Sequence, residues 1–304
     1  MGKRPVKEKA YYMKSMRDII KFYTKQGIIT SPGTQGELFK AAPDDIPGMV
    51  SMIQNLFIHI HWASRYGISV TEEQKEHVQS RFVEKILERI ITLDNRPLTE
   101  TRPYGRRFYG NCRDFSVFLV SLLRYKGIPA VARCGFGTYF NPGYFEDHWV
   151  VEYWDEEKGR RVMVDPQIDD LMRKRLDIQF DTLDMPSGHF LNAAEAWRLC
   201  REGQEDPEKF GIFDMRGLWF VRGNLLRDLA ALNKVELLPW DVWGLASRSE
   251  SEMSESDYVL LDQAAAAITG ESNEVLTFYE HELLKVSPVI VSFTPDGDLQ
   301  ERIY

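Results

Sequence analysis

Cysteine is scarce in this chain, which has three cysteines among 304 residues, at positions 112, 134 and 200. A small and odd number argues against a disulfide framework and favours a reducing compartment. The spacings of 22 and 66 residues match no zinc-binding pattern. We therefore expect no structural disulfide and no metal site, and nothing in the sequence calls for an organic cofactor.

Long apolar runs and an excess of basic residues are missing as well. No run of about 18 apolar residues occurs, so the sequence predicts no membrane partner. Residues 1–12 are basic but lack the apolar centre of a signal peptide. The formal net charge of −8 argues against a nucleic-acid partner, because such proteins usually carry a basic surface. We expect a cytoplasmic protein, whose oligomeric state the sequence does not indicate.

The chain also lacks internal repeats, a phosphate-binding glycine loop and a long Pro/Gly/Ser linker. We therefore expect a single domain over residues 1–304, of the α+β class. Its parts are a helical N-terminal part packed on the core (1–100), the core itself (101–171) and a mostly helical C-terminal part (172–304).

The N-terminal part contains a pair of histidines. Asp45 opens a helical pattern that runs through Phe57 and Ile60, so His59 and His61 are expected on that helix. Residues two apart do not face each other on a helix, which argues against a metal site. The alternatives are one packed and one exposed histidine, or a histidine that lines a substrate cleft.

A second feature of the N-terminal part is a capping box, with Thr71 as N-cap and Gln74 three residues later. The amphipathic pattern that follows predicts one long helix to Leu93.

The best-defined helix of the core begins at Cys112. Asn111 is a good N-cap residue, and Gly127 ends the pattern. The sulfur then lies in the first helical turn, where partial positive charge favours a thiolate. Apolar residues at three- and four-residue spacing predict one buried helical face: Phe115, Phe118, Leu119, Leu122 and Leu123.

Two predicted strands after this helix carry a histidine and an aspartate. His148 opens the apolar run 149–154, and Asp165 closes the run 161–165. If the hairpin turns near Glu157, the two residues lie at matching ends of antiparallel strands, where Cβ atoms are about 4.5–5.5 Å apart. We therefore expect a hydrogen bond between Asp165 and His148.

A cysteine that opens a helix, a histidine that starts a strand and an aspartate that ends the next strand resemble the core of the transglutaminase-like superfamily. The resemblance covers about residues 101–171 and includes Gly110, two residues before the cysteine. It implies a papain-like core, with a central helix packed on an antiparallel sheet and additional helices at both ends. It also implies that Cys112 is the nucleophile, His148 the base and Asp165 the orienting acid. The large accessory β-domains of cross-linking transglutaminases have no room in this chain, so protein cross-linking is not expected.

Other residues are candidates for stabilising or binding the substrate. An oxyanion needs hydrogen-bond donors, and the backbone N–H of Cys112 has three candidate companions: Asn111, Tyr109 and Trp62. Arginines are frequent near the nucleophile: Arg102, Arg106, Arg107 and Arg113. Arg106 and Arg107 are candidates for holding an anionic substrate group, although a solvated loop is the alternative. Trp149 and Trp240 are further candidates for binding the substrate; the stretch around Trp240 could wall a cleft or act as a lid, although such a run more often packs the core.

These features predict a thiol enzyme that acts on a peptide or a small amide or thioester through an acyl-enzyme. It would be a hydrolase with water as the acceptor and an acyltransferase with an amine. One alternative is a catalytically silent fold that binds a peptide or protein partner. Another is a redox protein that uses Cys112 and Cys134, although opposite ends of a helix–strand unit argue against their meeting.

Overall fold

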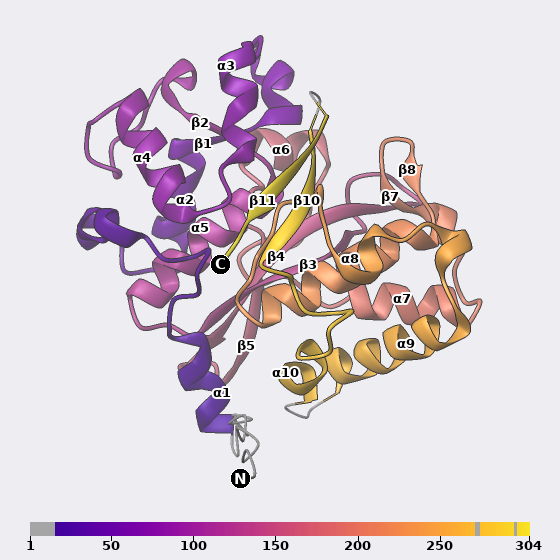
Figure 1. The fold of residues 1–304 in the computed structure, drawn as a ribbon. Coiled ribbons are helices and arrows are strands. Elements are labelled where there is room, and N and C mark those ends of the chain that lie inside the picture. The colour runs from indigo at the N-terminus through magenta and orange to yellow at the C-terminus, as the bar shows by residue number, and fades with distance from the viewer. Residues whose placement is uncertain (1–15, 271–273, 295–296) are drawn as a thin grey trace.

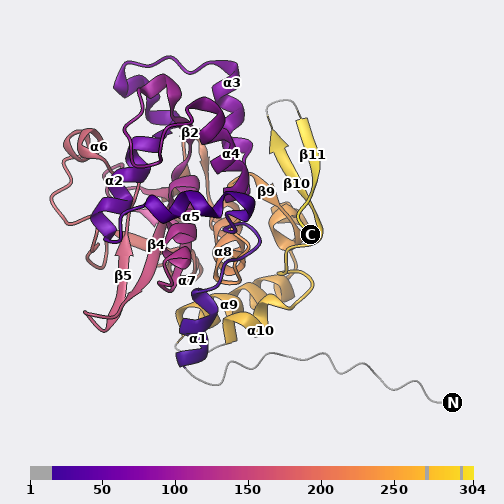
Figure 2. The ribbon, with the colours of Figure 1, turned by 90° about the vertical axis from the view of Figure 1, so that its left-hand side faces the viewer.

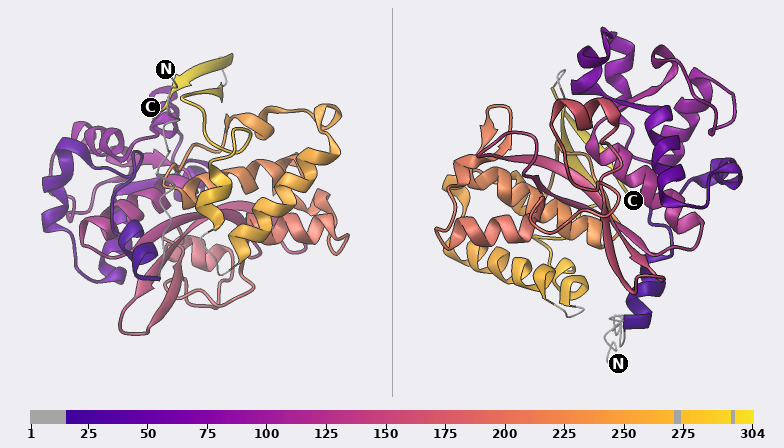
Figure 3. Two further views of the ribbon diagram at one scale, coloured as in Figure 1. Left: turned by 60° about the horizontal axis from the view of Figure 1, so that its bottom comes forward. Right: turned by 180° about the vertical axis from the view of Figure 1, so that it is seen from behind.

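The structure is a computed structural model that describes residues 16–270, 274–294 and 297–304. The basic residues 1–12 therefore lie outside the described residues. The fold is α+β, and the strands of a central sheet run between N-terminal helices on one side and C-terminal helices on the other (Figures 1 and 3). Within the described residues, no helix is both long enough and apolar enough to cross a membrane.

The N-terminal part is helical, but the helix that opens at Asp45 is shorter than expected. It ends at Leu56, and the next residues form a strand that pairs in parallel with a strand just before Cys112. His59 is therefore on a strand, and His61 is in a 3-10 helix, so the helical placement of both was wrong. The elements are α1 (Met16–Tyr23), η1 (Gly33–Ala41), α2 (Ile46–Leu56), β1 (Phe57–His59), η2 (Ile60–Tyr66), η4 (Tyr104–Arg106) and β2 (Phe108–Gly110).

The long helix expected between Thr71 and Leu93 is also divided. The predicted capping box is present, but the chain leaves the helical path around Arg81. The Arg81 side chain turns inward and donates to Asp241. The backbone carbonyl of Arg81 accepts a hydrogen bond from the Arg113 side chain and not from a backbone N–H of a continuous helix. The pieces are α3 (Glu72–Lys75), η3 (Glu76–Gln79) and α4 (Val83–Leu93).

Within the described residues the central sheet has six strands, in the order β6-β3-β4-β7-β8, with β5 also paired to β4. The pairs are antiparallel except for β4–β7, which is parallel. The helix α5 packs on β3 and β4. The bounds are α5 (Cys112–Tyr125), β3 (Ala130–Gly137), β4 (Phe145–Asp155), β5 (Arg160–Val164), β6 (Phe190–Asn192), β7 (Phe210–Ile212) and β8 (Met215–Arg216).

The C-terminal part contains the expected helices and more strand than expected. The helix α8 packs against β3 and lies beside α7, which in turn packs on α9. The β10–β11 hairpin stands apart from these helices (Figure 2). The remaining bounds are α6 (Asp170–Arg175), α7 (Ala193–Arg201), η5 (Pro207–Lys209), α8 (Leu218–Leu232), β9 (Asp241–Val242), η6 (Gly244–Ser247), η7 (Glu250–Glu252), α9 (Glu255–Thr269), α10 (Glu274–Tyr279), β10 (Val289–Thr294) and β11 (Gly297–Arg302).

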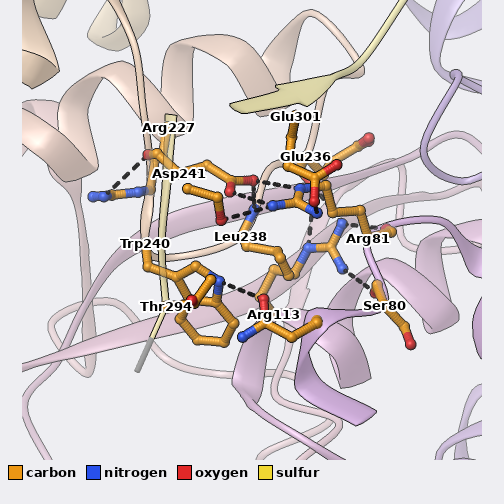
Figure 4. A network of polar contacts seen from close by, with 12 residues as sticks. Ser80, Arg81, Arg113, Arg227, Glu236, Leu238, Trp240, Asp241, Thr294 and Glu301 are labelled. Atoms are coloured by element: carbon orange, nitrogen blue, oxygen red, sulfur yellow. Dashed lines mark hydrogen bonds and ion pairs between the residues drawn. The ribbon is translucent and has the colours of Figure 1, made fainter. Parts of the chain in front are cut away.

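A buried polar network joins the N-terminal part, α5 and the C-terminal hairpin (Figure 4). Arg81 donates from Nε and Nη2 to the Asp241 carboxylate at 3.0 and 2.8 Å, and from Nη2 to Ser292 at 2.7 Å. Arg113, the residue after Cys112, donates to the backbone carbonyls of Arg81 and Glu236. The start of α5 is therefore fixed by contacts from three distant parts of the chain.

Candidate active site

The local sequence around Cys112 fixes the start of α5. Asn111 is the N-cap: its side chain accepts from the N–H of Asp114, and its own N–H donates to the Asp114 carboxylate at 2.9 Å. This capping box makes Cys112 the first helical residue, as expected. The Cys112 side chain is buried, with an exposed fraction of 7%.

The α5 N-terminus meets the sheet where one edge of β4 is interrupted. Along one edge, β3 pairs with β4 without a break from Glu146 to Tyr153. Along the other edge, β7 pairs with β4 up to Glu146, and β5 pairs from Val151 onward. Among the residues that the structure describes, no strand therefore pairs with residues 147–150 on this edge, and we call this stretch the β4 gap.

The backbone N–H of Trp149 points into the β4 gap. Its register partner Cys134 donates its own N–H to the Asp228 carboxylate at 2.9 Å, not to β4. Cys134 and Trp149 are thus a non-hydrogen-bonded pair, whose N–H groups point away from each other's strand. The Trp149 N–H lowers the pKa of the Cys112 thiol, which places this N–H near the sulfur. The sulfur consequently lies beside the residue that follows His148.

The hydrogen bond expected between His148 and Asp165 is present, but it joins diagonal neighbours across the β4–β5 pair and not residues directly opposite each other. His148 Nε2 lies 2.8 Å from Oδ2 of Asp165, and both side chains are buried. The ladder pairs Val151 with Val164, so Asp165 follows at the position opposite Val150 and not opposite His148. A diagonal neighbour is within reach of an aromatic ring. Because a carboxylate only accepts, Nε2 carries the proton, which leaves Nδ1 free to take another.

Three residues that the sequence analysis did not single out surround this pair. Tyr139 donates its hydroxyl to Oδ2 of Asp165 at 2.6 Å, and the Gln167 N–H donates to Oδ1 at 3.0 Å. The Phe140 ring packs against the His148 ring, with centroids 4.8 Å apart. The Asp165 carboxylate is therefore held by three donors, and the imidazole is held by aromatic packing. In the sequence, Tyr139 and Phe140 stand just before the turn at Pro142, and this pair of aromatic residues was the signal that could have pointed to them.

The charges around Cys112 work against the expected thiolate. Burial, and then the carboxylate of Asp147, raise the pKa of the Cys112 thiol well above its usual value. Asp114 and Asp165 act in the same direction, while the Trp149 N–H lowers this pKa. Asp147 is itself buried and accepts a hydrogen bond from Asn224 at 2.7 Å. The resting sulfur is therefore a neutral thiol.

Among the oxyanion candidates, Asn111 directly precedes Cys112 at the start of α5. Its Nδ2 is buried and, within the described part of the chain, has no hydrogen-bond partner. Tyr109 is fully buried, and its hydroxyl donates to the carbonyl of Tyr104, away from Cys112. Trp62 is half-buried and packs in a cluster that includes Phe140, so it lies at the periphery of the site.

The substrate-binding candidates are not gathered around the thiol. Arg106 donates to the carbonyl of Leu93 at 3.4 Å, and Arg107 donates to the carbonyls of Arg102 and Gln54, both at 2.9 Å. The buried guanidinium groups of Arg102 and Arg113 likewise serve backbone carbonyls. Arg102, Arg107 and Arg113 therefore organise the chain around the start of α5, whereas Arg106 is exposed and makes a single weak contact.

The two tryptophans proposed for binding the substrate also serve the framework. The Trp149 side chain is fully buried in the main core cluster, so only its backbone takes part in the site. Trp240 donates its indole N–H to Gln79 at 3.0 Å within the network of Figure 4.

His59, which the sequence analysis placed on a helix, lies beside the candidate nucleophile. The parallel β1–β2 pairing puts it opposite Gly110, two residues before Cys112. Its ring lies over Phe115, with centroids 6.5 Å apart. Burial, together with the neighbouring His61 and His148, lowers the pKa of His59 well below its usual value. The ring is therefore neutral, and a pairing between segments distant in sequence is what brings it to the site.

Cys134 is closer to Cys112 than expected, since both belong to the main core cluster and Cys134 is the register partner of Trp149. Both are free thiols. Among the residues that the structure describes, no three His, Cys, Asp or Glu side chains converge so as to hold a metal ion.

Comparison with known proteins adds no relative: no family model, curated protein or solved structure matches the chain.

Proposed function

We propose that this protein is a thiol enzyme of transglutaminase-like, papain-like architecture that acts on an amide or thioester carbonyl. The observation that carries the proposal is the 2.8 Å hydrogen bond between His148 and Asp165 beside the β4 gap, where the Cys112 sulfur also lies. The same three residues follow the order helix, strand, strand that the resemblance implies. A histidine oriented by a carboxylate next to a thiol is the arrangement that nucleophilic catalysis needs.

The reaction begins with the neutral thiol. As the Cys112 sulfur attacks the carbonyl carbon, its proton passes to Nδ1 of His148. Asp165, held by its three donors, stabilises the imidazolium through Nε2. The tetrahedral intermediate collapses, and the imidazolium gives its proton to the leaving amine or thiol. The resulting thioester on Cys112 is then attacked by water or by an amine, and His148 removes the proton of that acceptor.

The oxyanion requires donors that are in place before the reaction. The N–H groups of the first helical turn have no partner within the helix, and that of Cys112 is one of them. Asn111 Nδ2 is the second donor in this proposal, because it is buried beside Cys112 and, in the described structure, unpartnered. Its capping role fixes the side chain, since its oxygen accepts from the Asp114 N–H at 3.3 Å.

The test is acylation of the intact protein by a small activated ester and by a thioester, followed by mass spectrometry. We expect one acyl group on Cys112 and none in Cys112→Ala. General acid–base catalysis is worth about 10²–10⁴-fold, so His148→Ala is expected to slow acylation by that factor. Cys200→Ala, a change of the half-buried cysteine on α7, is the matched control and should acylate normally. Equal acylation rates in the wild type and His148→Ala would contradict the proposal.

A binding module without turnover is the second candidate, and the burial and raised pKa of the Cys112 thiol favour it. Such a protein would bind a peptide or partner at the same place but form no acyl-enzyme.

Adding hydroxylamine after the acylation step tests which acceptor the proposed enzyme uses. Because hydroxylamine cleaves any thioester without catalysis, each rate is compared with that of the same step in His148→Ala: accelerated formation of the hydroxamate indicates an acyltransferase, whereas acceleration of hydrolysis alone indicates a hydrolase.

A further inference from the structure

A continuous row of four rings leads from the surface to the candidate nucleophile. The Phe213 ring contacts the His61 ring, with centroids 5.1 Å apart, and His61 contacts His59 at 5.7 Å. His59 then lies over Phe115 at 6.5 Å. Residues three apart on a helix share a face, so Phe115 lies on the Cys112 side of α5. We call Phe213, His61, His59 and Phe115 the ring row.

The strand register places the outer end of the ring row by an independent route. The strand β7 runs parallel to β4 and pairs Gly211 with Glu146. Two residues further along these parallel directions are Phe213 and His148. The β7–β8 turn therefore lies at the His148 end of β4, next to the β4 gap. The ring contacts and the strand register therefore both place Phe213 at the His148 end of β4.

The backbone of Phe213 is in an unfavourable conformation. Its φ is +53°, in the left-handed region, within the two-residue turn between Ile212 and Met215. Turns of this kind favour Gly, Asn or Asp at positive φ, and a bulky residue there is strained. The ring is 57% exposed, so burial in the core does not offset the strain. A strained backbone that holds an exposed aromatic ring near the candidate site is a reason to look for function there.

The charge around this end of the molecule disfavours an anionic ligand. Burial lowers the pKa of His61, so the rings of the row are uncharged. Asp147 and Asp165 lie near the sulfur, and their field, which raises the pKa of the thiol, also repels an anion. Arg216, which donates to the Phe213 carbonyl, is paired with the carboxylate of Glu146 at 3.4 Å, and Arg107 donates to the carbonyls of Arg102 and Gln54.

We propose that Phe213 and His61 form a subsite for an uncharged aromatic group of the substrate, adjacent to the carbonyl that Cys112 attacks. The inference rests on the proposed function and names its substrate class, an amide or thioester that carries an aromatic group. An aromatic ring of the substrate would pack against the exposed side of these two rings, whose centroids are already 5.1 Å apart, and extend the ring row. The turn holds Phe213 in a strained conformation, so the ring is already in place before the substrate arrives.

The test uses three alkylating probes with one reactive group: iodoacetamide, its N-phenyl analogue and its N-(4-carboxyphenyl) analogue. The rate of modification of Cys112 is followed by peptide mass spectrometry, and each rate is divided by the rate with glutathione. The normalised rate with the N-phenyl probe should exceed that with iodoacetamide by about two- to tenfold, the range for one aromatic contact. The carboxylated probe should lose this advantage.

Variants of Phe213 test the subsite. In Phe213→Gly the advantage of the phenyl probe should vanish, and in Phe213→Tyr it should remain. Phe293→Ala, which removes another half-exposed aromatic ring from β10, is the matched control and should retain the wild-type ratio. Phe213→Gly should also melt no lower than the wild type, because glycine relieves the positive φ. An unchanged probe ratio in Phe213→Gly, or a faster reaction with the carboxylated probe than with the phenyl probe, would overturn the proposal.

His148→Ala separates this inference from the proposed function. If the function is right, His148→Ala slows all three probes by the same factor and keeps the phenyl advantage. If His148→Ala reacts as fast as the wild type, the catalytic proposal fails. In that case the probe ratio in Phe213→Gly still decides whether the aromatic subsite exists.

Discussion

The buried ion pair between Arg81 and Asp241 allows a sharp test of what holds the start of α5. The perturbation is Asp241→Asn, which keeps the shape of the side chain and removes its charge. Asp241 is fully buried, accepts twice from Arg81 and also accepts the N–H of Leu238 at 2.9 Å. The substitution therefore removes the nearest counter-charge of the buried Arg81 guanidinium, which keeps Ser292 as a partner and the more distant, partly exposed carboxylate of Glu301, 3.6 Å from Nη1.

The magnitude follows from that burial. Removing one partner of a buried pair costs about 3–5 kcal/mol of unfolding free energy, because the remaining charge is uncompensated. For a chain of this size the melting temperature should fall by roughly 6–15 °C. The matched control is Asp184→Asn. Asp184 pairs with Lys158 and Arg160, whose side chains are 44% and 51% exposed, so the loss should be about 0–1 kcal/mol.

The assay is urea denaturation of both variants, with thermal melting as the second measurement. A third variant, Arg81→Met with Asp241→Asn, removes both charges and should be more stable than Asp241→Asn alone. If Asp241→Asn costs no more than Asp184→Asn, or if the double variant is less stable than the single one, the Arg81–Asp241 pair is not the anchor that its geometry indicates.

Three further predictions concern titration and positioning. Asp147→Asn should lower the pKa of the Cys112 thiol, measured as faster alkylation by iodoacetamide at neutral pH; an unchanged or slower rate would contradict the assigned effect of this carboxylate. His77 is buried, and burial first lowers its pKa to about 4. As the pH falls from about 6.5 to 4, the unfolded state therefore takes up this proton before the folded state does. The free energy of unfolding should decline more steeply over that range in the wild type than in His77→Asn. The same pH dependence in both proteins would refute this. Tyr139→Phe removes a 2.6 Å hydrogen bond to Asp165 and should slow acylation by about tenfold or more without preventing folding, whereas a wild-type rate would show that the bond does not orient the carboxylate.

The parts of the site that sequence could predict depend on local rules. The helix at Cys112 begins and ends where its N-cap and Gly127 predict, because capping residues act within a few positions. His148 and Asp165 were found because a hairpin brings together residues that are close in the chain. Even there the register differs, since Asp165 reaches His148 diagonally across the ladder.

The parts that sequence missed depend on pairing between distant segments. Phe57 and Ile60 continue the apolar spacing of α2, and this spacing predicted that the helix continues. A short apolar run is equally compatible with a strand. Only its pairing with β2 decides the matter and brings His59 to Gly110. Likewise, the arginines before Cys112 were judged by proximity in sequence, whereas the fold supplies each with backbone carbonyls. The β4 gap arises from where β5 and β7 stop, which no local pattern encodes.

The neutral thiol determines the order of events proposed for the site. The α5 N-terminus favours a thiolate, but a helix terminus contributes only about 0.3–1 kcal/mol at an exposed position. Burial and the carboxylates of Asp147 and Asp165 act in the opposite direction, and charges inside a protein are screened little by salt. The Asp165 carboxylate that opposes a thiolate is also the hydrogen-bond partner of His148, the proton acceptor in the proposed mechanism. In that mechanism the proton is therefore transferred during attack, and no ion pair waits for the substrate. An alkylating reagent should then find Cys112 slow at neutral pH in the absence of substrate.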